Sequence, residues 1–305
     1  MKNNKLSQIS NSKKISDIDL KTLKDVEKKI SWLSAWMIHN ANNIRPSMDG
    51  IKVGGHQASS ASIISIMVAL YFKILNSEDR VAVKPHAAPV FHSIQYLLGN
   101  QTLDKLEKFR AFGGAQSYPS RTKDTDDVDY STGSVGLGGA ITIFGSLIQD
   151  YVAQHNFVSK NFRHGKMVAL LGDAELDEGN IYEALLEGAK QNVRNCWWVI
   201  DYNRQSLDAV VADKLHLKID ELFASMGWRV ITLKYGKKLQ SLSKIKGGNE
   251  ILNWIDNCPN DLYSALSYMG SKGWREHLNI DLKNNKDSIN IIKSLSDEEL
   301  NETMS

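Results

Sequence analysis

The sequence has few of the residues and runs that cross-link, bend or anchor a chain. It contains two cysteines and five prolines in 305 residues. Cys196 and Cys258 form no CxxC pair, so we expect neither a disulfide nor a zinc site, and a reducing compartment fits this usage. The longest mainly apolar run, 63–72, is far shorter than the ~20 residues of a membrane helix. The N-terminus is polar and unlike a secretory signal, so we expect a cytoplasmic protein with no membrane partner.

An excess of charge of either sign is also absent. There are 37 basic and 35 acidic side chains, and the formal net charge is +2. This balance argues against a nucleic acid as partner. The hydrophobic share of 42% and the charged share of 24% are ordinary for a globular protein, and the length suits one large or two modest domains.

Apolar spacing organises the first half of the chain. Residues 1–16 are polar and predict a disordered tail, whereas 17–43 repeat apolar side chains at helical spacing and predict an amphipathic helix. The stretch 58–75 predicts a buried helix, and 81–83 predicts a short strand. Residues 112–134 are rich in Gly, Ser, Thr, Pro and Asp, which predicts a long loop, and loops of this length are usually functional or disordered.

Strands and helices alternate in the second half of the chain. We expect helices over 138–155 and 178–191, and strands over 167–171, 197–200 and 230–233. This alternation is typical of an α/β fold with a mainly parallel sheet, here a three-layer sandwich. We therefore predict an α/β domain over 17–246, followed by a C-terminal helical extension over 247–305.

The most informative segment is an apolar strand that ends in Gly172 and Asp173. Asn203 follows 30 residues later, just beyond the next apolar strand. The carboxyl ends of parallel strands meet at one edge of a sheet, where ligands bind against the next helix N-terminus. A carboxylate and an amide oxygen at that edge suit Mg²⁺ and a phosphate. Taken singly, Asp173 is an ordinary helix cap and Asn203 an ordinary turn residue, but the pair at this spacing favours a metal site.

Five spaced segments carry a resemblance to a known family. They are 54–59 (Gly-Gly-His-Gln-Ala-Ser), 113–119 (Gly-Gly-Ala-Gln-Ser-Tyr-Pro), 131–138 (Ser-Thr-Gly-Ser-Val-Gly-Leu-Gly), 172–178 with 201–208, and 294–300. In this order they resemble the thiamine-diphosphate-dependent enzymes of the transketolase-like superfamily, and among these the homodimeric kind of pyruvate dehydrogenase first component. The similarity runs from about residue 28 to residue 305. The last segment is similar to the one that precedes this family's second domain.

The resemblance implies a thiamine diphosphate cofactor held through Mg²⁺. Asp173 and Asn203 would bind the metal with their side chains, and Gln205 would bind it with its main-chain carbonyl. After Gly172, Ala174 and Glu175 would offer backbone N–H groups to the diphosphate. Ala174 departs from the family pattern, in which a second glycine stands, and a methyl group is tolerated there only if φ stays negative.

The resemblance also implies residues for the cofactor and substrate cleft. His56 and His86 would be catalytic, Ser59 would line the cleft with them, and Val135 would pack near the aminopyrimidine. Both are flanked by turn residues beside apolar segments, but without the resemblance an ordinary surface histidine would be the more common explanation of each. His92 differs because it lies on the face of an apolar helix, so we expect it to pack.

The family's activating glutamate has no counterpart in this sequence. It protonates the aminopyrimidine ring of the cofactor, and in the resembling enzymes it belongs to a second, pyrimidine-binding domain. We therefore expect that domain to come from a partner chain, or the sequence to be a truncated product. We also expect an oligomer and a lipoyl-bearing acyltransferase as a further partner.

The function that the resemblance implies is decarboxylation of a 2-oxo acid, pyruvate first of all, with acyl transfer to a lipoyl group. Two alternatives stay open. A transketolase would move a two-carbon ketol unit between sugar phosphates, and it would carry extra basic groups for the phosphate. A non-catalytic cofactor-binding or assembly subunit would catalyse no reaction.

Overall fold

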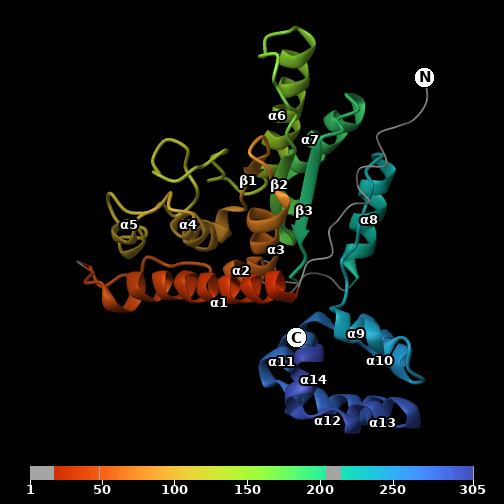
Figure 1. Cartoon of the computed structure of the whole chain (residues 1–305). Coiled ribbons are helices and arrows are strands. Elements are labelled where there is room, and N and C mark those ends of the chain that lie inside the picture. Colours follow the sequence, from red (N-terminus) through yellow and green to blue (C-terminus); the bar gives the residue numbers. More distant parts are fainter. Residues whose placement is uncertain (1–16, 48, 204–213, 305) are drawn as a thin grey trace. The chain divides into compact units, whose positions relative to one another are not determined.

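The computed structural model describes residues 17–47, 49–203 and 214–304 (Figure 1). These residues form two compact units, and the chain divides between them after Asn203. The division lies earlier than the domain boundary predicted at residue 246. The predicted tail 1–16 and Gln205 lie outside the described residues.

A parallel sheet of three strands forms the centre of the first unit. Its strands are β1 (Arg80–Ala82), β2 (Met167–Gly172) and β3 (Cys196–Asp201), in the order β1-β2-β3. Val81 pairs with Val168, and Gly172 pairs with Asp201. The strands predicted over 81–83, 167–171 and 197–200 are confirmed to within one or two residues.

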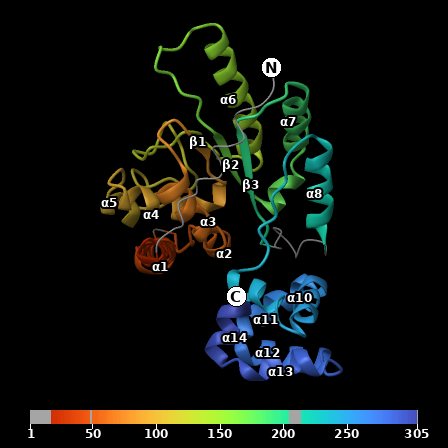
Figure 2. The same ribbon diagram turned by 45° about the vertical axis from the view of Figure 1, so that its right-hand side comes forward.

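Helices cover both faces of this sheet, as Figures 1 and 2 show. The helices that cover it are α1 (Asp17–His39), α3 (Ile64–Ala69), α4 (Ala88–Leu97), α6 (Leu137–Gln154) and α7 (Gly179–Lys190). On one face, Val81, Val168 and Leu170 pack in a core with residues of α1, α3 and α4. On the other face, α6 passes so close that a Cβ on its Gly138 would lie 3.4 Å from the Ala82 Cβ. The predicted three-layer α/β architecture is therefore confirmed.

The stretch predicted as one buried helix over 58–75 is broken. It consists of α2 (Gln57–Ala61), α3 and the π-helical turn η2 (Leu70–Ile74). The break falls at Ser62 and Ile63, and the Ser62 hydroxyl donates to the Asp201 carboxylate. By length and composition alone, 57–74 would pass for a membrane span. Ile63 and Met67 are fully buried in the core of this unit, which accounts for its apolar character.

The remaining helical predictions of the first unit hold. The helix predicted over 17–43 is α1 followed by the π-helical turn η1 (Asn40–Ile44), and the two long helices predicted later are α6 and α7. The segment 112–134 contains no helix or strand, as predicted. Shorter elements are η3 (Pro85–Ala87), α5 (Leu103–Glu107) and η4 (Asp173–Asp177).

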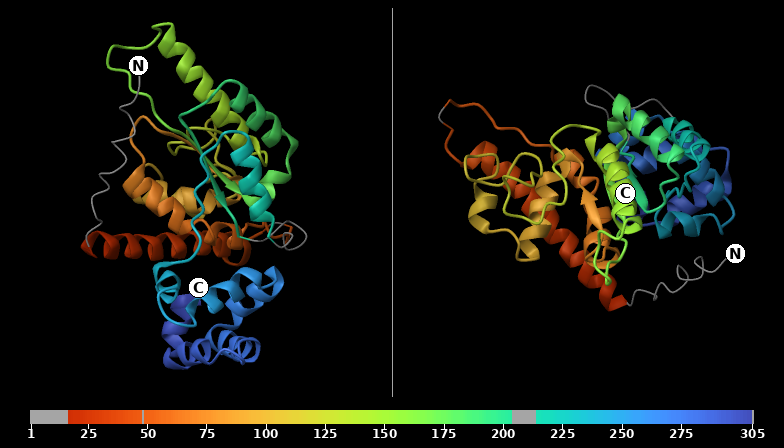
Figure 3. Two further views of the ribbon diagram at one scale, coloured as in Figure 1. Left: turned by 90° about the vertical axis from the view of Figure 1, so that its right-hand side faces the viewer. Right: turned by 90° about the horizontal axis from the view of Figure 1, so that it is seen from above.

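The second unit consists of helices (Figure 3). They are α8 (Leu215–Ser225), α9 (Lys237–Leu242), α10 (Gly248–Asn257), α11 (Asn260–Met269), α12 (Ser271–Asp281), α13 (Lys286–Ser294) and α14 (Asp297–Met304). Trp274 and Leu278 are buried at the centre of its core. The short helices predicted after residue 249 are therefore confirmed.

The strand predicted over 230–233 is wrong. Its side chains are apolar and favour a strand, but the backbone there forms no ladder with any described residue. Ile231 is 68% exposed and Leu233 is 94% exposed. A strand needs a hydrogen-bonded neighbour as well as suitable side chains, and strand propensity alone does not supply one.

Candidate active site

The register of β2 and β3 brings the predicted metal ligands to one edge of the sheet. Gly172 pairs with Asp201, so Asp173 and Asn203 both follow the last paired residues of neighbouring parallel strands. The Asp173 side chain is deeply buried, with 2% of the residue exposed, whereas Asn203 is half-buried. A buried carboxylate at a strand end is costly unless it is paired or binds a cation.

A buried ion pair lies at the same edge, and the sequence did not reveal it. Lys84, just after β1, places its Nζ 2.7 Å from Oδ2 of Asp201, and both side chains are enclosed. The Ser62 hydroxyl donates to the same oxygen at 2.5 Å, and the Asn203 amide nitrogen lies 3.5 Å from that hydroxyl. The predicted ligand Asn203 is thus linked through Ser62 to the ion pair.

Glu175 joins this edge to the loop before α6. Its carboxylate accepts the Gly172 N–H at 3.0 Å and the Gly136 N–H at 2.9 Å. Burial raises the pKa of Glu175, and these two N–H groups and the charge of Lys84 oppose the rise. Gly136 adopts a φ of +79°, and a Cβ there would lie 2.7 Å from the Glu178 Cβ, so this position requires glycine.

The half-buried Val135 precedes that glycine. Because the Gly136 N–H is bonded to the Glu175 carboxylate, Val135 is held near the strand edge with it.

The two histidines predicted as catalytic lie against each other. The rings of His56 and His86 stack with their centroids 3.8 Å apart. Burial lowers the pKa of His56, and the Arg110 charge lowers it further. Burial and the nearby charges of His56, Lys84 and Arg110 lower the pKa of His86 to about 4. Both rings are therefore neutral at neutral pH and able to accept a proton or donate one hydrogen bond.

Two residues that the sequence did not single out border this pair. The Tyr118 ring lies 6.0 Å from the His86 ring. The Arg110 guanidinium lies 5.9 Å from the Tyr118 ring and donates to the Val53 carbonyl at 2.7 Å. Arg110 precedes the predicted long loop, and Tyr118 lies within it, in the segment 113–119 that carries part of the resemblance; the fold is what shows both beside the histidine pair.

Ser59 is half-buried on α2, one residue before the fully buried Ser60. The Ser60 hydroxyl donates to the His86 carbonyl at 3.0 Å, which fixes η3 against α2. Ser59 is the sequence neighbour of the serine that makes this contact.

The residues at the strand edge fit a magnesium–diphosphate group. Carboxylate and amide oxygens are ligands that Mg²⁺ prefers, with water and phosphate completing its shell. Ala174 is absent from the positive-φ positions among the described residues, so its methyl group is compatible with the turn that the family builds with glycine. Its N–H points at the Asp173 Oδ1, 3.1 Å away. Gln205, predicted as a third ligand, lies outside the described residues.

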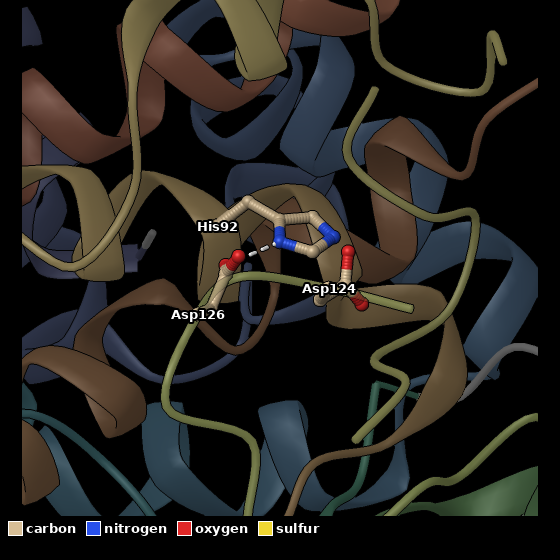
Figure 4. Close-up of side chains that lie close together, drawn as sticks. All are labelled: His92, Asp124 and Asp126. Carbon is tan, nitrogen blue, oxygen red and sulfur yellow. Dashed lines mark hydrogen bonds and ion pairs between the residues drawn. The ribbon is translucent and has the colours of Figure 1, made fainter. Parts of the chain in front are cut away.

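One further group of ionisable residues lies away from the strand edge (Figure 4). His92, Asp124 and Asp126 have ligand atoms within 4.8 Å of one another. His92 is fully buried on α4, so the expectation that it packs is confirmed. Its polar partners on the loop, 32 and 34 residues further on, could not be recognised from local spacing.

Comparison with known proteins connects this geometry to a family. The family described as "Transketolase, thiamine diphosphate binding domain" matches residues 47–247. The pyruvate dehydrogenase E1 component of Mycolicibacterium smegmatis is 28% identical over 270 residues, covering 83% of this chain and 28% of that protein. That of Buchnera aphidicola subsp. Schizaphis graminum is 25% identical over 293 residues, covering 92% of this chain and 32% of that protein.

Solved structures give the same fold. Transketolase from Leishmania mexicana aligns with a TM-score of 0.58 at 20% identity, over 70% of this chain and 32% of that one. Transketolase from Campylobacter jejuni aligns with a TM-score of 0.57 at 21% identity, over 69% of this chain and 33% of that one. The chain spans about a third of the length of the relatives that it matches.

Proposed function

Because this chain belongs to the family of transketolase thiamine diphosphate-binding domains, we propose that it holds the diphosphate end of thiamine diphosphate through Mg²⁺ in an enzyme that decarboxylates a 2-oxo acid. The observation that carries the proposal is the register of β2 and β3, which sets Asp173 and Asn203 at one edge. Pyruvate is the proposed substrate and a lipoyl group the proposed acyl acceptor, because relatives over most of this chain are named pyruvate dehydrogenase E1 component.

Each residue of the site has a proposed role. Asp173 and Asn203 bind the magnesium ion with side-chain oxygens, and Gln205 adds its carbonyl. In the turn after Gly172, Ala174 and Glu175 offer backbone N–H groups to the diphosphate, while the Gly172 N–H stays bonded to the Glu175 carboxylate. The Glu175 carboxylate holds Gly136, and with it Val135, close to the strand edge.

The histidine pair acts at the substrate end. When bound, thiamine diphosphate supplies the electron sink that a 2-oxo acid needs to lose carbon dioxide. His56 and His86 are neutral at neutral pH, so each donates a hydrogen bond from one ring nitrogen and accepts a proton at the other. Ser59 lines the same side. The aminopyrimidine-activating acid is proposed to come from a pyrimidine-binding domain or chain, in a cytoplasmic oligomer.

The test is a substrate comparison with the complete protein and its partner chain. With thiamine diphosphate and Mg²⁺ added, the proposal predicts carbon dioxide release from pyruvate and acyl transfer to a lipoyl domain. Ketol transfer from a sugar phosphate, without release of carbon dioxide, would contradict the proposal and indicate a transketolase instead. Cofactor binding without turnover of either substrate class would indicate an assembly subunit.

A further inference from the structure

The hydrogen bonds around His92 define the charge of its ring (Figure 4). The side chain is fully enclosed, and its Nε2 lies 3.0 Å from the Gln116 carbonyl oxygen. A carbonyl oxygen only accepts, so this nitrogen carries a proton. On the other side, Nδ1 lies 2.7 Å from Oδ2 of Asp126.

The surroundings of Asp126 complete the assignment. Its second oxygen accepts a hydrogen bond from the Gln101 amide. The contact of Oδ2 with Nδ1 is therefore assigned as a hydrogen bond donated by a ring that is protonated at both nitrogens. Burial alone would lower the pKa of His92, but its hydrogen bond to Asp126 and the charges of Asp126 and Asp124 raise it.

A histidine and two aspartates are also the residue types of a metal site. Here their atoms are already engaged: both ring nitrogens donate, and the Asp124 carboxylate accepts the N–H groups of Gln116 at 2.9 Å and Ser120 at 2.8 Å. A metal ion would need a deprotonated ring nitrogen and would displace the Gln116 carbonyl. We call the charged cluster of His92, Asp124 and Asp126, with its bonds to the main chain of Gln116 and Ser120, the clamp.

The clamp holds the turn that carries Tyr118. Gln116 and Ser120 flank this tyrosine, and both are bonded to the cluster by their main chains. We propose that His92 is a positioning residue, whose imidazolium holds segment 116–126 in place and so fixes Tyr118 beside His86. Its relevance to catalysis rests on the proposed function, whereas the clamp itself does not.

The direction of the pH dependence follows from the groups that face the ring. Asp124 and Asp126 are the ionisable ones, and the other groups beside the ring, Phe91, Phe109 and the Gln116 carbonyl, are uncharged. Because the pKa of His92 in the folded protein lies above its ordinary value of 6.5, the clamp is complete below that pH. It is released as the pH rises through the folded-state pKa.

Trypsin cleavage measures whether the clamp holds segment 116–126 in place. Arg121 and Lys123 are exposed within the clamped loop, and Lys160 and Arg163 are exposed in a separate loop that serves as internal control. The ratio of cleavage in the two loops cancels the pH dependence of trypsin itself. In the complete protein the ratio should rise between about pH 6 and about pH 9. In His92→Gln it should be raised about tenfold at both pH values, since one charge-assisted hydrogen-bond pair is lost.

Nitrogen-15 spectra of the histidine rings give the second readout. Near neutral pH, both nitrogens of His92 should be protonated, and Asp126→Asn should shift the His92 titration to lower pH even if His92→Gln folds poorly. The Overhauser contact between the Tyr118 and His86 rings should weaken in both variants. Three results would overturn the proposal. The first is a neutral His92 ring near neutral pH, and the second is zinc uptake that Asp124→Asn abolishes. The third is cleavage ratios and ring contacts in the variants that equal those of the wild type.

Discussion

Lys84 and Asp201 form a buried ion pair between the ends of β1 and β3, with Nζ and Oδ2 2.7 Å apart. Removing one partner of such a pair leaves an uncompensated charge in the protein interior. We expect Lys84→Met or Asp201→Leu alone to lower the free energy of unfolding by about 3–5 kcal/mol. The double variant should recover most of this loss.

The matched control for the ion pair is Lys108 with Asp104, an exposed pair at 2.7 Å whose side chains are 52% and 62% exposed. Either single substitution there should change the free energy of unfolding by less than about 1 kcal/mol. Urea unfolding measures both sets. Equal effects at the two pairs would mean that the charge of Lys84 is solvated.

His56 and His86 should matter more for turnover than for cofactor binding. Alanine at either position should lower kcat by about 10²–10⁴-fold and leave the affinity for thiamine diphosphate nearly unchanged, because a proton donor or acceptor at the substrate is lost. The exposed His164 provides the control variant, which should keep wild-type kinetics. Turnover within a factor of about two of wild type for both alanine variants would make the pair structural.

The depressed pKa of His86 makes the folded state sensitive to acid. Its pKa is about 4 in the folded protein and 6.5 without the fold, so the unfolded chain binds more protons between these values. Its contribution therefore makes stability decrease as pH falls from 6.5 towards 4. Urea unfolding across this range should show a shallower pH dependence for His86→Gln than for wild type, and parallel curves would contradict the assignment.

A substitution at Gly136 tests the turn that is bonded to the Glu175 carboxylate. Gly136→Ala places a Cβ 2.7 Å from the Glu178 Cβ at a φ of +79°, so we expect destabilisation of about 2 kcal/mol or more. Gly133 in the same loop has open space around it and no positive φ, so Gly133→Ala should be nearly neutral. Thermal unfolding of the two variants compares them, and equal melting temperatures would show that the turn is not strained.

The parts of the fold that the sequence predicted correctly are those with a strong local signal. The strands 167–171 and 197–200 are apolar runs between turn residues, and α1 has a clear helical repeat. The failed strand at 230–233 has the same local signal but lacks a neighbouring strand among the described residues. Local pattern and pairing partner are separate requirements.

In the site too, the residues that could be predicted are those with a local sequence signal. Asp173 and Asn203 could be predicted because each follows an apolar strand, and parallel strands end at one edge. The bond between Lys84 and Asp201 joins residues 117 positions apart, and neither residue has a spacing that marks it. His92 with Asp126 is a similar case, since only the course of the long loop brings them together.

The most direct measurement is calorimetry of thiamine diphosphate binding to the complete protein, with and without Mg²⁺. The wild type should bind only with the metal, and Asp173→Asn should lose about 100-fold or more in affinity, because even outer-shell changes at metal sites cost 10–100-fold. Asp177→Asn, an exposed carboxylate of the same η4 turn, should bind like wild type. Unchanged, Mg²⁺-dependent affinity in Asp173→Asn would contradict the placement of the metal at the end of β2.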